Sequence, residues 1–368
     1  MTRVNKKLGK TTQREVAQLA GVGRSTVSMA LRGDKRISPE IRARVIEASK
    51  QLNYSITNSN DEARRLIAKR LGRYVPFKSI GLVWPKGEGM HEYPFYQIIF
   101  QGIVEACWET DYSLMLLNVK PGHESELLGL FHIDGIILPI PSEEHFEVLQ
   151  KLNLPLVTTY FKRPNTANIG IDDEHAIEIA FRYLYENGHR KIGFISPAIE
   201  HPTAQIRWRA YRKCLADAGI RYNSSYVLAD NTFDEQAEQG AYAIEKILKR
   251  EDKPTSIIFY NDVMALAGLK KAQKLGIAVG EELSVISIDG SPESALSTPP
   301  LTTVSVDLKE MGRQAALLIV EFINSGRYEA KHIDVPIQLI IRESVKKIAY
   351  KEKYSYKLNT KSSVKINL

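Results

Sequence analysis

Short apolar runs alternate with longer amphipathic stretches along residues 80–344, and this alternation limits the chain to a few architectures. An uninterrupted apolar run of four or five residues is typical of a strand buried on both faces of a sheet. Apolar residues spaced three and four apart indicate helices between those strands. Alternating strands and helices form right-handed βαβ units around parallel sheets. The sequence therefore predicts an α/β body.

The length of this body exceeds one sheet of ordinary size, so we expect two lobes with a cleft between them. Ligands in such sheets bind beyond the carboxyl ends of the strands. The predicted strands are Ile80–Trp84, Leu114–Leu117, Gly135–Leu138, Leu156–Thr159, Ile192–Ile195, Ile257–Tyr260 and Val285–Ile288. The predicted helices are 96–109, 175–187, 205–218, 235–250, 262–275 and 309–324.

Charge is distributed unevenly along the 368 residues. The net formal charge is +11 for residues 1–73 and +6 for residues 345–368, whereas residues 74–344 carry −10. A single charged run is usually a solvated surface. A compact basic segment beside an acidic body is instead typical of a module that binds a polyanion. The N-terminal segment is therefore the candidate for nucleic-acid binding.

Three short helices are predicted within residues 1–58. Thr12 can cap the first helix, Gly21-Val22-Gly23 ends it, and the second runs from Arg24 to about Leu31. Ser38-Pro39 begins the third, because serine caps well and proline fits the first helical position. The apolar stripe of the third helix is Ile41, Val45, Ile46, Ala48 and Leu52.

This spacing fits a helix-turn-helix and a generic three-helix bundle equally well. The second helix favours the helix-turn-helix, because arginines and short hydroxyls lie off the face that Val27 and Leu31 bury. Such side chains suit contacts with bases and phosphates. They are Arg24, Ser25, Thr26, Ser28 and Arg32.

The run from Thr12 to Gly33 resembles the head of the lactose-repressor family of bacterial regulators. Its Val-Ala, Ala-Gly-Val and Thr-Val-Ser elements stand in the family's order, and Ser38-Pro39-Glu40 and Leu52-Asn53-Tyr54 also fit. The resemblance implies base contacts in the major groove from Arg24, Ser25 and Met29. Arg24 could bind guanine O6 and N7, and Met29 could contact a thymine methyl. The residues implied to position phosphates are Thr12, Thr26 and Ser28.

The connector, residues 59–79, contains a stretch similar to the family's hinge helix, which enters the minor groove. Leu66 matches the leucine that wedges a base step, Asn60 would cap the helix, and Arg64 matches the family's arginine. The alternative is a short surface helix with an exposed leucine. Ser59 stands where the family has proline, Glu62 replaces a small apolar residue, and the linker is longer. Coupling between body and head is therefore expected to be looser.

The same resemblance covers residues 80–344, where it implies the fold of periplasmic sugar-binding proteins. It rests on Phe131 to Leu138, Asn187 to Gly193, Asn261 to Ala265, Pro299 to Val304 and Glu310 to Arg313. The residues implied to bind a small effector are Phe95, Tyr96, Tyr160, Arg207, Asn261 and Asp289.

Each implied polar contact has an alternative. Asn261 and Asp289 could cap helices, and Arg207 could lie on a helix surface as Arg209 and Arg212 are expected to do. Tyr160 stands where many family members have aspartate. An aromatic side chain at this position favours stacking on a ring of the effector. The family favours a sugar or sugar derivative, and the aromatic residues keep a nucleobase open.

Motifs of catalysis are missing from the sequence: it contains no nucleophile elbow, Walker loop, dinucleotide fingerprint or His-Glu-x-x-His. Cys107 and Cys214 suit buried helix positions, and the histidines lack metal-ligand spacing. We expect no enzyme activity, cofactor, metal or membrane segment, and a cytoplasmic location because no signal segment is seen. The alternatives are a ligand-binding protein without a DNA role, and an enzyme with a DNA-binding appendage.

The predicted fold class is multi-domain: an all-α helix-turn-helix head, residues 1–58, and an α/β body of two parallel-sheet lobes, residues 80–344. The linker is 59–79, and residues 345–368 form a basic tail expected to be disordered. The predicted function is a homodimeric, effector-responsive transcriptional regulator that binds a palindromic double-stranded DNA operator.

Overall fold

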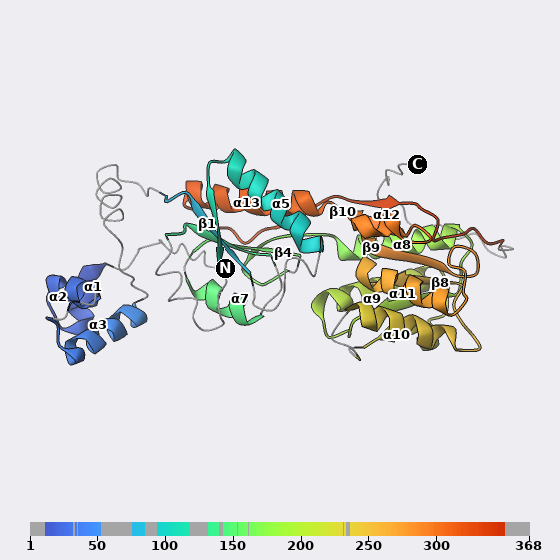
Figure 1. Cartoon of the computed structure of the whole chain (residues 1–368), viewed down its shortest axis with the longest axis horizontal. Helices are drawn as coiled ribbons and strands as arrows, with labels where there is room; N and C mark the ends of the chain where they lie inside the picture. The colour runs from blue at the N-terminus through green and yellow to red at the C-terminus, as the bar shows by residue number, and fades with distance from the viewer. Residues whose placement is uncertain are drawn as a thin grey trace.

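The computed structural model describes residues 12–31, 34, 36–52, 76–84, 94–117, 132–139, 143–152, 154–160, 162–230, 232 and 236–349. The head consists of α1 (Gln13–Ala20), α2 (Arg24–Leu31) and α3 (Pro39–Gln51) (Figure 1). These helices share a small core of their own, formed by Val16, Ala17, Ala20, Val27, Ala30, Val45 and Ala48. The prediction that Ile46 belongs to the buried stripe of α3 is wrong. Its side chain is exposed, because Val45 occupies the inward position.

Capping fixes the ends of the head helices as the sequence predicts. Thr12 caps α1 through a reciprocal box, in which its hydroxyl accepts from the amide of Glu15 and the carboxylate of Glu15 accepts from the amide of Thr12. Gly21 ends α1 in the left-handed region with φ 63°, where glycine avoids the Cβ clash of other residues. The hydroxyl of Ser38 accepts from the amide of Ile41 at the start of α3.

The first lobe is built on a parallel sheet with strand order β11-β5-β4-β3-β1-β2. Alternate side chains of its strands face opposite layers: Ile137 packs toward α5 and α13, whereas Ile136 and Leu138 pack toward α7. The elements of this lobe are β1 (Ser79–Val83), α5 (Pro94–Glu109), β2 (Ser113–Leu117), β3 (Gly135–Leu138), α7 (Glu143–Leu149), a 3-10 turn (Gln150–Leu152), β4 (Leu156–Thr159), β5 (Ala167–Gly170), α13 (Leu308–Ser325) and β11 (His332–Asp334).

The second lobe has strand order β12-β10-β9-β8-β6-β7, parallel except for the edge pair of β10 and β12. Helices α8 and α9 lie on one face of its sheet, and α10 and α11 on the other. Its elements are α8 (Asp173–Glu186), β6 (Ile192–Ser196), α9 (Pro202–Asp217), a 3-10 turn (Ser224–Tyr226), β7 (Val227–Ala229), α10 (Gln236–Leu248), β8 (Ser256–Phe259), α11 (Asp262–Lys274), β9 (Ser284–Asp289), α12 (Pro292–Leu296), β10 (Thr302–Val306) and β12 (Ile337–Ile340).

The chain crosses between the lobes after β5, after β10 and after β11. The crossings are hydrogen-bonded to one another. The amide of Val335 donates to the carbonyl of Gly170 at 2.9 Å, and the amide of Asp307 donates to the carbonyl of Pro336 at 3.3 Å. In two-lobed proteins, a few residues in such connections act as the hinge.

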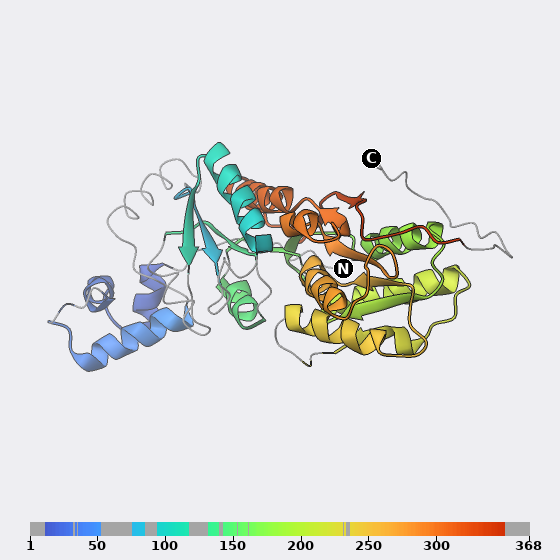
Figure 2. The same ribbon diagram turned by 45° about the vertical axis from the view of Figure 1, so that its right-hand side comes forward.

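Helices α5 and α13 lie side by side in both views of the molecule (Figures 1 and 2). Glycines permit the close approach, because a Cβ atom at Gly102 would collide with the carbonyl oxygen of Lys309, and one at Gly312 with that of Ile99. Ion pairs Lys309–Glu105 and Arg313–Glu109, at 2.8 and 3.0 Å, flank the contact. Among the described helices of the body, the first, α5, is thereby joined to the last, α13.

The predicted fold class is confirmed: a helix-turn-helix head precedes two α/β lobes with parallel sheets. The sequence did not predict the strands β5, β7, β10, β11 and β12 or the short helices α7 and α12. Among the segment predicted as a tail, residues 345–349 are described and continue along the second lobe, where the amide of Ile348 donates to the carbonyl of Asn187 at 2.9 Å. The remaining residues of that segment lie outside the described part, and the domain boundaries stay predictions.

Candidate functional site

The N-terminal half of α2 presents an exposed polar surface. Arg24 and Ser25 are exposed, and Met29 lies one turn after Ser25 on the same side and is half-buried. Thr26 and Ser28 are half-buried, whereas Val27 and Ala30 face the core of the head. The helix therefore divides into a core face and a face that offers a guanidinium, a hydroxyl and a thioether to a partner.

Thr12 is exposed at the start of α1, but its hydroxyl is already used in the cap and also donates to Glu15 at 2.9 Å. Its predicted phosphate contact remains a prediction. Asn60, Arg64 and Leu66, the predicted minor-groove residues, lie outside the described residues.

The predicted effector residues of the two lobes meet beyond the carboxyl ends of the strands. Tyr160 follows β4 of the first lobe, and Asp289 ends β9 of the second. The hydroxyl of Tyr160 donates to the carboxylate of Asp289 at 2.9 Å. Both residues have positive φ, 71° and 128° respectively, a conformation that costs free energy and often marks a functional position.

Arg207 is the largest fully buried side chain of the chain's described part, with 1% of its surface exposed. This excludes the surface-helix alternative. Its Nε donates to the carboxylate of Asp173 at 2.7 Å, Nη1 donates to the carbonyl of Tyr260, and the guanidinium lies 4.5 Å from the ring centre of Tyr260. Among the described residues, its buried Nη2 has no hydrogen-bond partner. An orphaned charged donor of this kind suits an acceptor on a bound molecule.

Aromatic rings line the first-lobe side of this cluster. The ring of Phe95 lies edge-on to that of Tyr160, with centroids 4.8 Å apart, and to that of Tyr96 at 5.1 Å. Tyr96 in turn contacts Trp84 at 6.0 Å. The structure therefore brings Phe95 and Tyr96 of α5 together with Tyr160, which follows β4.

Asn261 serves as the cap of α11. Its side-chain oxygen accepts from the amide of Met264 at 3.0 Å, and its side-chain nitrogen donates to Gln236 at 2.6 Å. The capping alternative thus accounts for its oxygen, and its contact with an effector stays a prediction.

Burial changes the protonation of the cluster. Desolvation raises the pKa of Asp289 to about 7, against the opposing charge of Arg207. Desolvation, followed by the charge of Asp289, raises the pKa of Tyr160 well above its usual range. Burial acts to lower the pKa of Arg207, but the charge of Asp173 raises it on balance, so the arginine stays protonated. The site holds a permanent cation beside a carboxyl that titrates near neutrality.

Two contributors to this cluster escaped the sequence reasoning. Asp173 lies in an acidic first turn of a helix, where aspartate is common for reasons of the helix dipole, so nothing marked it. Tyr260 ends an apolar strand run just before Asn261, and an aromatic residue at that position was the available signal. Within the described residues, no group of three or more His, Cys, Asp or Glu side chains is placed to hold a metal ion.

Comparisons with known proteins agree with this architecture. The family model described as "Bacterial regulatory proteins, lacI family" matches residues 12–56, and the model described as "Periplasmic binding protein-like domain" matches residues 181–345. The HTH-type transcriptional repressor PurR of Haemophilus influenzae (strain PittEE) is 30% identical over 351 residues, covering 92% of this chain and 99% of the relative. The PurR of Pasteurella multocida (strain Pm70) is 30% identical over 346 residues, covering 91% and 98%.

Solved structures give the same result. A complex of the transcriptional regulator CelR with cellobiose superposes with a TM-score of 0.65 at 27% identity, covering 91% of this chain and 99% of that one. The lac repressor dimer bound to operator and an anti-inducer superposes with a TM-score of 0.63 at 21% identity, covering 92% and 100%, and shows the shared fold. The chain belongs to the lacI family of bacterial regulatory proteins.

Proposed function

We propose that this chain is a cytoplasmic, homodimeric transcriptional repressor whose affinity for a palindromic operator is set by a small molecule bound between its two lobes. The observation that carries the proposal is the contact of Tyr160 in one lobe with Asp289 in the other, at the carboxyl ends of both sheets. A molecule bound there touches both lobes at once, so its binding free energy depends on their separation.

On the DNA side, the exposed face of α2 is the proposed base-reading surface. Arg24 contacts guanine O6 and N7, Ser25 contacts a base edge, and Met29 contacts a thymine methyl. Thr12, Thr26 and Ser28 position phosphates, and Asn60, Arg64 and Leu66 form the minor-groove hinge.

On the effector side, Phe95, Tyr96 and Tyr160 pack against a ring of the ligand. The buried Nη2 of Arg207, which has no hydrogen-bond partner among the described residues, donates to an acceptor on the ligand. Asp289 and Asn261 supply further polar contacts. We propose a sugar or sugar derivative, as in the cellobiose complex of CelR. A nucleobase is the second candidate, because the rings of Phe95 and Tyr160 offer flat surfaces for stacking.

The proposed dimer forms through the body. Val104 and Trp108, one turn apart on α5, are 41% and 88% exposed, and Leu116 on the adjacent β2 is 53% exposed. Large exposed apolar side chains on neighbouring elements are typical of protein interfaces. This interface spaces two heads for two half-sites, and an effector that changes lobe closure changes the spacing.

The test is selection of a binding site from random duplex DNA by the full chain, with and without a small-metabolite extract, followed by a salt titration. We expect a palindromic site that is bound at least about 10³-fold more tightly than random DNA, with a steep salt dependence. A protein that binds only small molecules and selects no DNA would instead be a ligand-binding protein without a regulatory role.

A further inference from the structure

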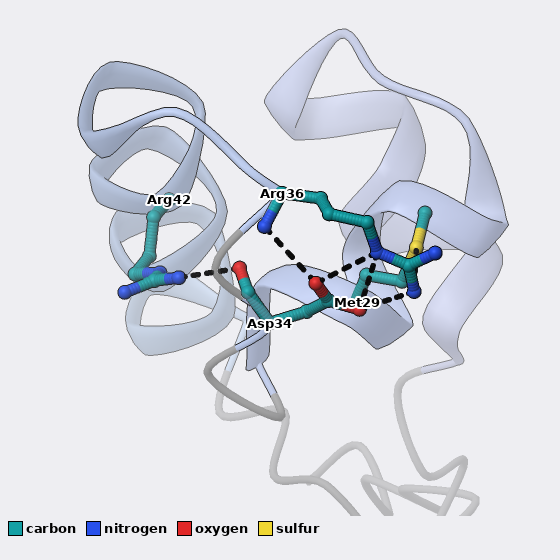
Figure 3. Close-up of polar contacts among 4 residues, drawn as sticks. All are labelled: Met29, Asp34, Arg36 and Arg42. Carbon is teal, nitrogen blue, oxygen red and sulfur yellow. Dashed lines mark hydrogen bonds and ion pairs between the residues drawn. The ribbon is translucent and has the colours of Figure 1, made fainter.

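The turn after α2 places an arginine beside one of the proposed base-reading side chains. The amide of Asp34 donates to the carbonyl of Met29 at 3.0 Å, and Nη2 of Arg42 donates to the carbonyl of Asp34 at 2.6 Å. The turn is therefore tied to both α2 and α3. Figure 3 shows Arg36 reaching back over this turn, where its Nη2 lies 4.0 Å from the sulfur of Met29.

Asp34 fixes the orientation of the Arg36 guanidinium. One carboxylate oxygen accepts from the backbone amide and from Nε of Arg36, each at 3.0 Å, and the other accepts from Nη2 at 2.6 Å. The Arg36 side chain is nevertheless 80% exposed. An exposed arginine ordinarily samples many rotamers, so fixing it in advance lowers the entropic cost of a later contact.

The contacts with Asp34 also decide which donors remain available. They use Nε–H and one hydrogen of Nη2, and within the described residues Nη1 has no partner. The second hydrogen of Nη2 faces only the sulfur of Met29, which is a weak acceptor. Among the described residues, the Nη1–Nη2 end of the fork therefore has no partner stronger than this sulfur, and two acceptors side by side can bind there.

Electrostatics favours a base over a phosphate as the partner. The hydrogen bonds from Arg36 lower the pKa of Asp34 to about 2, so the carboxyl stays ionised and the pair carries no net charge. A neutral pair gains little Coulomb energy from a phosphate, and the carboxylate repels it. The O6 and N7 atoms of guanine are uncharged acceptors at a spacing that matches the arginine fork.

We propose that Arg36, held by Asp34, reads a guanine in the major groove next to the base contacted by Met29. The inference rests on the proposed function of operator recognition. Arg36 then acts as a specificity-determining residue, and Asp34 as the residue that positions it. Met29 supplies an apolar backing for the guanidinium rather than acting alone.

The test is site selection by full-length wild-type protein and by the variants Arg36→Ala, Arg36→Lys and Asp34→Ala, each checked for its thermal unfolding. We expect Arg36→Ala to lose roughly 5- to 150-fold of the preference for guanine at one symmetric pair of positions, with other positions unchanged. Arg36→Lys loses the same preference, because it keeps the charge but lacks the fork. Asp34→Ala relaxes the same position and binds random DNA more tightly, since a negative charge is removed.

The matched control is Arg44→Ala, which removes the same charge from an exposed position on α3 and leaves the selected sequence unchanged. Two results would overturn this inference without affecting the proposed function. One is an unchanged guanine preference in Arg36→Ala. The other is a uniform loss of affinity of Arg36→Ala for all sequences with a salt slope reduced by about 1, which indicates a phosphate contact. A wild-type protein that selects no site under either condition would overturn the proposed function and this inference with it.

Discussion

The hydroxyl of Tyr160, which follows a strand of the first sheet, donates to the carboxylate of Asp289, which ends a strand of the second. This hydrogen bond joins residues 129 positions apart and lies within the proposed effector site. A ligand that uses Asp289 must therefore compete with Tyr160 for it. The hydrogen bond that links the two lobes is therefore made by two of the residues proposed to bind the effector.

Removing the Tyr160 hydroxyl tests this link. Tyr160→Phe leaves a buried carboxylate without its donor, so we expect a loss of about 1–3 kcal/mol in the free energy of unfolding, measured with denaturant. The control is Tyr222→Phe, because among the described residues its ring packs on Arg212 while its hydroxyl makes no hydrogen bond. Equal stabilities of Tyr160→Phe and wild type would show that the bond contributes nothing.

Stability should depend on pH through Asp289. Its pKa is raised to about 7 in the folded chain, so the folded state holds a proton that the unfolded state has already released. The stabilisation is fully present below about pH 4 and is lost as the pH rises toward 7, by at most about 1.4 kcal/mol for each pH unit. Asp289→Asn should remove this decline while preserving an oxygen acceptor for Tyr160.

The measurement is the unfolding temperature of wild type and Asp289→Asn from pH 5 to pH 8. The two curves should differ most at the alkaline end, where the wild-type carboxyl has lost its proton. Parallel curves over this range would mean that Asp289 titrates at its ordinary pKa.

Arg207 and Asp173 form a buried pair, with 1% and 8% of their side chains exposed. Arg207→Met leaves Asp173 as an uncompensated buried charge, so we expect a loss of about 3–5 kcal/mol in denaturant unfolding. The double variant Arg207→Met with Asp173→Asn should recover part of that loss. The exposed Arg209→Met should change stability by no more than about 0.5 kcal/mol. A double variant less stable than Arg207→Met would refute the charge-pair explanation.

The contact of α5 with α13 predicts a steric effect. Gly102→Ala places a methyl group against the carbonyl of Lys309, and we expect a loss of about 2 kcal/mol or more as the helices separate. Gly219→Ala is the comparison, because it meets open space at a positive φ of 64° and should cost only about 1 kcal/mol. The unfolding temperatures of both variants measure these losses. A Gly102→Ala protein as stable as wild type would rule out the close packing of α5 and α13.

The proposed dimer can be tested at Trp108, which is 88% exposed on α5. Trp108→Glu introduces a charge into the interface and should shift sedimentation equilibrium from dimer toward monomer by at least about tenfold in dissociation constant. Trp108→Phe retains the aromatic anchor and should stay dimeric. A dimeric Trp108→Glu protein would place the interface elsewhere.

Local structure was largely determined by the sequence. The bounds predicted for α2, β3 and β4 agree with the structure, and the cap at Thr12 and the turn at Gly21 were read from residue type alone. These features depend on periodicity and on backbone preferences within a few residues, which a sequence displays directly. The strands β7, β11 and β12 have only three or four residues each, which is too short to show a period.

The composition of the site was decided by the tertiary structure. The family resemblance pointed to Tyr160, Arg207 and Asp289, but only the fold brought Asp173 to Arg207 and the Tyr160 hydroxyl to Asp289. Likewise, the sequence of α2 was enough to predict a role for Met29, but only the fold of the following turn brings Arg36 next to it. The physical reason is that such pairs depend on strand order and helix docking, which are set by packing of the whole core and leave no mark on the spacing of the residues themselves.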